Sequence, residues 1–217
     1  MKPLSSLLIL LMVATLSTGS MFASTVLYNQ PINQCCGDGG LYSNDPSQLA
    51  ADLFNLAGGG TINQAVWYGA AYNGLSFGTF NVEFYDGTGG TPGAQLYIFT
   101  AAPTIVDTGM LDPYGLELYQ FTMNIPAFTA LAGANYFFSA SDSGPFNFVW
   151  ENSTLTSGGF FSDNGKFGPW NDLSGTVRAS QAFTLLNAGT TPEPGTFVLL
   201  GSSLLGVAGV LRRKLSH

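Results

Sequence analysis

The stretch Phe80-Asn81-Val82-Glu83-Phe84-Tyr85-Asp86 decides the fold class, because apolar and polar residues alternate along most of it. In an extended chain this alternation places Phe80, Val82 and Phe84 on one face of a strand. Asp86-Gly87-Thr88-Gly89-Gly90 follows directly and has the composition of a tight turn. The stretch therefore predicts a β-strand that ends in a turn.

Similar strand-like segments occur on both sides of this strand, and turn residues such as Gly58-Gly59-Gly60 and Asp112-Pro113 separate them. Several of these segments, such as Tyr136-Phe137-Phe138, are apolar on both faces, so two sheets should pack face to face. The sequence predicts an all-β body, a two-sheet β-sandwich or jelly-roll-like fold. Seven further strands are expected, at Thr25–Asn29, Ile62–Ala71, Gln95–Thr100, Leu116–Met123, Asn135–Ala140, Phe146–Glu151 and Gln181–Leu186.

One segment fits two patterns. Residues 45–48, Asp-Pro-Ser-Gln, resemble a helix N-terminus, and leucines 49, 53 and 56 follow at helical spacing. Asp52, Phe54 and Leu56 also alternate as in a strand. We expect a short helical turn followed by a strand.

The composition limits the classes of function. Only 9% of the 217 residues are charged, and residues 24–190 hold two basic residues against twelve acidic ones. Such an acidic body argues against nucleic acid as a partner. A surface with few charges suits an exported β-protein, and the length suits one domain plus targeting segments.

Both ends of the chain have targeting features. Residues 1–23 combine Lys2, an apolar run and small residues, which predicts a secretory signal peptide. Near the other end, Pro192-Glu193-Pro194 interrupts regular secondary structure before an expected apolar helix at 196–211. The fifteen apolar residues 197–211 of this helix reach ~23 Å, short of a ~30 Å hydrocarbon core, so it is only marginally long as a transmembrane helix.

Arg212, Arg213 and Lys214 follow that helix, and by the positive-inside rule they stay in the cytoplasm while the body is exported. The predicted organisation is therefore a signal peptide, a β-sandwich domain, a linker with the Pro-Glu-Pro motif, and a C-terminal signal. These segments are expected at 1–23, 24–187, 188–195 and 192–217, with a basic tail at 212–217.

Pro-Glu-Pro, a short apolar helix and a terminal basic cluster together resemble the PEP-CTERM sorting signal of Gram-negative bacteria. The same kind of segment is also described as the ice-binding protein C-terminal domain, a label that implies nothing about ice for this body. The resemblance implies an exosortase-type membrane transpeptidase as partner, transient membrane attachment, and delivery to the cell surface or exopolysaccharide matrix. More loosely, Ala51–Leu56, Trp67–Ala70, Phe80–Tyr85 and Gly89–Gly93 are similar to body segments common among such proteins.

Enzymatic chemistry is mostly eliminated. The single histidine, His217, lies at the end of the tail, which excludes histidine-dependent catalysis and imidazole-bound zinc from the body. Paired carboxylates would suit a glycoside-active enzyme, but nothing pairs Glu83, Glu117 and Glu151, and we expect each to point outward. The body is therefore expected not to be an enzyme.

Three smaller features leave alternatives open. Adjacent Cys35 and Cys36 would form a vicinal disulfide after export, or remain thiols, or bridge to another molecule. No cofactor or metal site is expected. A structural calcium ion is the alternative, because Asp and Asn gather in loops at Asn44-Asp45, Asp86, Asp142, Asp163-Asn164-Gly165 and Asn171-Asp172.

Aromatic residues make up 13% of the chain and raise the question of carbohydrate binding. Trp67, Trp150, Trp170, Tyr68, Tyr72 and Tyr114 would stack on sugars from an open face or fill the core. Trp150 alternates with Phe146 and Phe148 and is expected in the core, whereas Trp170 is the best exposed candidate. We expect an exported structural or adhesive surface protein. The alternatives are a carbohydrate-binding module and, less favoured, an enzyme using Glu or Asp on glycosides.

Overall fold

The computed structural model describes residues 22–33, 40–44, 47–71, 77–144, 148–155, 158–162, 169–176 and 180–192. The chain divides into two units, of which one is Thr25–Ala188 and the other comprises Met1–Ser24 and Gly189–His217. Within the described ranges there is no helix long and apolar enough to cross a membrane. The expected helix 196–211 and residues 1–21 of the expected signal peptide lie outside these ranges.

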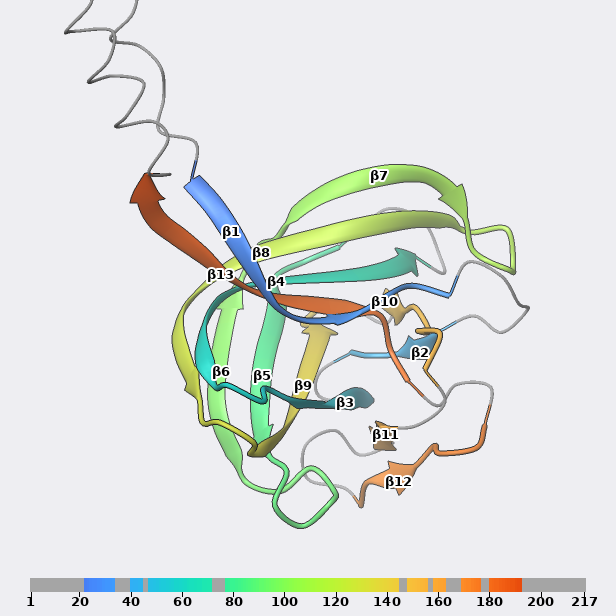
Figure 1. Cartoon of the computed structure of the whole chain (residues 1–217). Helices are drawn as coiled ribbons and strands as arrows, with labels where there is room; N and C mark the ends of the chain where they lie inside the picture. The colour runs from blue at the N-terminus through green and yellow to red at the C-terminus, as the bar shows by residue number, and fades with distance from the viewer. Residues whose placement is uncertain are drawn as a thin grey trace, which may run out of the picture. The chain divides into compact units, whose positions relative to one another are not determined.

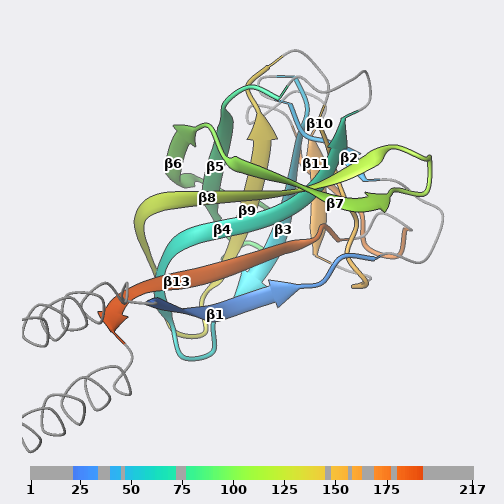
Figure 2. The ribbon, with the colours of Figure 1, turned by 90° about the horizontal axis from the view of Figure 1, so that it is seen from above.

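The described strands form two antiparallel sheets (Figure 1). The centre of the seven-stranded sheet is β4, which pairs along one edge with β8 and along the other with β13 and then β10. Figure 2 shows β13 lying between β1 and β4. The strands of this sheet are β1 (Phe22–Gln30), β2 (Leu41–Tyr42), β4 (Gly60–Ala71), β7 (Thr104–Leu111), β8 (Glu117–Ala130), β10 (Phe148–Trp150) and β13 (Phe183–Pro192).

The second sheet has six strands in the order β12-β11-β3-β9-β5-β6. The strand that decides the fold class, β5, lies between β9 and β6. The bounds are β3 (Leu49–Asn55), β5 (Phe80–Asp86), β6 (Gln95–Ala101), β9 (Asn135–Asp142), β11 (Gly159–Ser162) and β12 (Asn171–Asp172). The predicted all-β, two-sheet architecture is confirmed.

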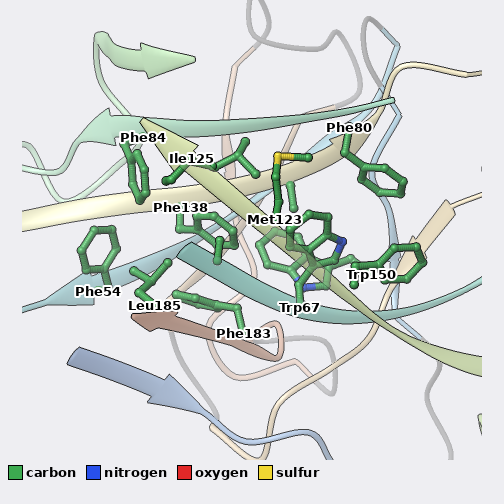
Figure 3. Packing of buried hydrophobic residues seen from close by; sticks show 14 of the residues in the cluster. Phe54, Trp67, Phe80, Phe84, Met123, Ile125, Phe138, Trp150, Phe183 and Leu185 are labelled. Carbon is green, nitrogen blue, oxygen red and sulfur yellow. The ribbon is translucent and has the colours of Figure 1, made fainter. Parts of the chain in front are cut away.

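Aromatic side chains from both sheets meet in one core (Figure 3). Phe80 of β5 packs 5.4 Å from Trp67 of β4 between ring centroids, and Phe138 of β9 packs 4.8 Å from Phe183 of β13. Trp150 is fully buried in the same cluster, as its alternation with Phe148 predicts. Burial of this apolar surface between the sheets is the main contribution to the stability of the fold.

Strand β8 extends beyond its expected end at Met123, through Pro126 to Ala130. Its pairing with β4 shifts between Ile62 and Gln64, which face Phe128 and Asn124. Proline cannot donate a ladder hydrogen bond, and an irregularity of this kind accommodates it inside a strand. The strand therefore continues where a proline would ordinarily end it.

The ambiguous segment contains a turn at Ser47 and Gln48, whose amides both donate to Asn44 O. The strand β3 begins immediately afterwards, at Leu49. From Leu49 onward the segment is therefore a strand, as the alternation indicates, and not a helix. Asp45 and Pro46 lie outside the described residues.

Candidate functional site

Glu151 directly follows β10 and is held in place by the strand next to it. Its amide donates to Tyr68 O at 2.9 Å, and its carbonyl accepts from the amide of Ala182 at 2.8 Å. Because Trp150 points into the core, the next residue along an extended chain faces the outer side of the seven-stranded sheet. Glu151 is nevertheless only 3% exposed, and its Oε1 has no hydrogen-bond partner.

Asp112 opens the turn between β7 and β8. The sequence Asp112-Pro113-Tyr114-Gly115 is typical of a type I turn, with Pro at its second position. Gly115 has φ +80° and donates to Asp112 O at 3.0 Å. Asp112 Oδ1 accepts from the amides of Tyr114 at 2.9 Å and Leu116 at 2.7 Å. Asp112 is only 7% exposed, and its other oxygen, Oδ2, is buried without a hydrogen-bond partner.

Both carboxyl groups line one pocket of about 310 Å³, which we call the carboxylate pocket. The amides of Gly40 and Asn152 donate to the Glu151 carboxylate. Burial and, to a smaller extent, the charge of Asp112 outweigh these hydrogen bonds and raise the pKa of Glu151 to about 7. Glu151 can therefore take up or release a proton near neutral pH, next to a second acidic group.

Apart from the two carboxylates, one amide side chain, Asn33, lines the carboxylate pocket, and the other lining residues are apolar: Ile32, Met110, Leu111, Pro113 and Leu118. Of the residues that the structure describes, none is lysine, arginine or histidine. Electrostatically, the arrangement suits a positively charged ligand.

The other two glutamates do not join this pair. Glu83 was expected to point outward, and it does face away from Phe80, Val82 and Phe84. It is fully buried, however, and accepts hydrogen bonds from Tyr85 Oη and from Gln95 Nε2 at 2.8 Å. Glu117 is exposed and accepts from Tyr119 Oη. The expectation of a solvent-facing side chain is therefore wrong for Glu83 and Glu151.

The aromatic candidates for sugar stacking lie in different places. Trp67 is fully buried between the sheets, so its ring is not available to a ligand. Trp170 is half-buried and meets Tyr85 edge-on, at 5.7 Å between centroids and an interplanar angle of 71°. Together with Phe137 and Phe160 it belongs to a small apolar cluster outside the main core. Tyr114 is 61% exposed, on the turn that carries Asp112.

Two of the Asp-rich loops expected to suit calcium use their carboxylates within the loop. Asp86 accepts from the amide and hydroxyl of Thr88, and Asp172 accepts from the amide of Ser174. These contacts are Asx turns, which need no metal. Within the described part of the chain, no three His, Cys, Asp or Glu side chains gather as a metal site.

The remaining predicted site residues are Cys35, Cys36, Glu193, Pro194, Arg212, Arg213 and Lys214, all outside the described residues. Pro192 is the last residue of β13. That strand runs through residues 188–192, the first part of the expected linker.

Comparison with protein families addresses this end of the chain directly. The family model described as the PEP-CTERM protein-sorting motif matches residues 190–214. The chain carries a PEP-CTERM motif. The match includes Pro192-Glu193-Pro194 and the basic cluster, the features that carry the resemblance in the sequence. A search of curated proteins gives no match to the chain.

The PEP-CTERM motif marks the protein for export and for exosortase-mediated sorting to the cell surface. It covers the tail and says nothing about the carboxylate pocket. In the sequence Asp112 is visible only as a turn residue, because its proximity to Glu151 arises from the pairing of β4 with both β8 and β10.

Proposed function

We propose that this protein is a structural or adhesive component of the cell surface or exopolysaccharide matrix, delivered there through its PEP-CTERM motif. The observation that carries the proposal is the order of the parts, a β-sandwich with its own aromatic core followed by a sorting motif. In this proposal the exosortase recognises the tail, and the body acts without catalysis.

The edges of the two sheets support the adhesive part of the proposal. Among the described strands, β6 ends the six-stranded sheet and β7 pairs with β8 alone. Both strands carry exposed apolar side chains, among them Leu96 and Ile98 on β6 and Ile105 and Val106 on β7. Edge strands with apolar side chains and few charges favour pairing with other chains.

Sorting is tested by replacing Pro192, Glu193 and Pro194 together with alanine in a host that carries an exosortase. Proline blocks helix continuation and leaves extended backbone accessible to a processing enzyme. The wild type should be shortened and leave the inner membrane, whereas the triple variant should stay full-length within it. Intact mass and membrane fractionation measure both properties.

A variant with Thr190→Ala and Thr191→Ala is the matched control, because it alters the adjoining residues and keeps Pro-Glu-Pro. It should be processed like the wild type. Equal mass and equal location of the wild type and the triple variant would contradict the proposal.

A further inference from the structure

We propose that Asp112 and Glu151 bind one calcium ion in the carboxylate pocket. The inference goes beyond the proposed function, since neither sorting nor surface delivery requires it. It rests on two carboxylates from different elements, each more than nine-tenths buried and each with one oxygen that has no hydrogen-bond partner. Both line the same pocket of about 310 Å³.

Each of the two unpartnered oxygens can donate an electron pair to a bound cation. A buried carboxylate without a partner is unfavourable, and buried charges in proteins are usually paired or bind metals. The amides of Tyr114 and Leu116 satisfy only Oδ1 of Asp112, and Oδ2 remains without a donor. A cation between Asp112 Oδ2 and Glu151 Oε1 would satisfy both oxygens at once.

The lining of the pocket favours a hydrated metal ion over a sugar or another polar organic molecule. A sugar needs several donors and acceptors, but apart from the two carboxylates the lining offers one amide side chain, Asn33, among apolar residues. The pocket is also large enough for an ion that retains several water molecules. Calcium accepts six to eight oxygen ligands in irregular geometry, whereas Mg²⁺ demands a nearly ideal octahedron.

The position of the ion explains what it would do. Asp112 belongs to the turn between β7 and β8, whereas Glu151 follows β10 at the opposite edge of β4. Calcium bound by both would connect the β7–β8 hairpin to the outer face of the seven-stranded sheet. With only two carboxylates, we expect an affinity typical of weak extracellular sites, with Kd on the order of 10⁻⁴–10⁻³ M.

The test uses the full chain purified in detergent, freed of metals with a chelator and kept at pH 8, where Glu151 is largely ionised. Isothermal titration with CaCl₂ should show one calcium ion per chain. At a calcium concentration ten times the Kd, Tm should rise by about 3–5 °C. MgCl₂ at the same concentration should give a clearly smaller rise.

Asp112→Asn and Glu151→Gln should each weaken calcium binding at least tenfold and abolish the rise in Tm. In calcium-free buffer both variants should be at least as stable as the wild type, because each removes an uncompensated buried charge. The matched control is Glu117→Gln, which removes one charge from β8 without changing a residue that lines the pocket. It should bind calcium like the wild type.

Two results would overturn the proposal. One is a wild type that neither binds calcium at 10 mM nor changes its Tm. The other is a loss of affinity in Glu117→Gln as large as in Glu151→Gln, which would mean that calcium responds to the overall acidity of the surface.

Discussion

Asp52 of β3 accepts a hydrogen bond from the hydroxyl of Ser180 at 2.7 Å, across 128 residues of sequence. The amide of Gln181 donates to the same carboxylate oxygen, and Ser180 Oγ in turn accepts from Gln30 Nε2 at 2.6 Å. These contacts connect the six-stranded sheet to the segments that form β1 and β13 of the other sheet. Asp52 is fully buried, and its Oδ1 has no hydrogen-bond partner.

The first prediction concerns pH. Burial raises the pKa of Asp52 to about 8, although the hydrogen bonds from Gln181 and Ser180 oppose the shift. The folded chain therefore holds a proton that the unfolded chain, with its ordinary pKa near 4, releases. The contribution of Asp52 to stability is highest below pH 4, falls as pH rises to about 8, and is constant above that.

Asp52→Asn should remove this contribution while keeping an oxygen that accepts from Ser180 and Gln181. The variant should be more stable than the wild type at pH 8, and the difference should shrink toward pH 4, by about 1.4 kcal/mol per pH unit at most. Urea unfolding at several pH values measures it. A difference that is the same at pH 5 and pH 8 would contradict the assignment.

The second prediction concerns the aromatic core. Phe138 packs against Phe84, Trp150 and Phe183 at 4.8–5.7 Å between centroids. Phe138→Ala should lower the free energy of unfolding by about 3–5 kcal/mol, because it leaves a cavity where the sheets meet. Leu131→Ala, at a side chain that is 65% exposed, should change it by less than about 0.5 kcal/mol. Equal effects would show that the two sheets do not pack through Phe138.

The third prediction concerns close backbone approach. A Cβ at Gly69 would lie 2.2 Å from the Phe148 ring and 2.6 Å from Val149 O, whereas a Cβ at Gly89 would meet nothing within 4 Å. Gly69→Ala should therefore force β10 away from β4 and cost about 1–3 kcal/mol. Gly89→Ala is the matched control and should be close to neutral. Thermal unfolding of both variants decides, and a neutral Gly69→Ala would contradict the pairing of β4 with β10.

The fourth prediction concerns the sheet edges. Leu96 and Val106 are each 51% exposed, on β6 and β7. If these edges are adhesive, we expect the chain to associate with itself through them. Replacing both residues with lysine should then weaken that association by about tenfold or more, because charged side chains on edge strands oppose pairing. Analytical ultracentrifugation measures the change. Leu155→Lys places a lysine at an exposed leucine away from both strands and should leave association unaltered. An equal loss in this control would remove β6 and β7 as the contact surface.

The prediction of the fold succeeded where the period-two pattern is strong. Phe80, Val82 and Phe84 lie in the core as their alternation requires, and Trp150 follows the same rule. It failed for β7, where Thr104–Leu111 has irregular alternation and is mostly exposed. In the described part of the chain its partner is β8, which supplies the pairing that the local sequence does not reveal.

The functional features were likewise only partly predictable from the sequence. The tail could be identified because its three parts are contiguous in the sequence. The pair of Asp112 and Glu151 could not, because 39 residues separate them and their approach depends on the register of three strands. The surroundings of Glu83 were also hidden, since one of its hydrogen-bond donors, Gln95, comes from the neighbouring strand β6.

The position of β13 has a mechanical consequence. Residues 183–186 pair with residues 64–67 of β4, and β1 pairs on the other side, so the strand that leads into the sorting motif is an interior one. A pull on the tail along the axis of this strand would load its hydrogen bonds to β4 in shear, all at once. Opening them one by one would require force across the strand instead. An enzyme that pulls on the tail in this direction during processing would therefore meet the resistance of the whole pairing between β13 and β4.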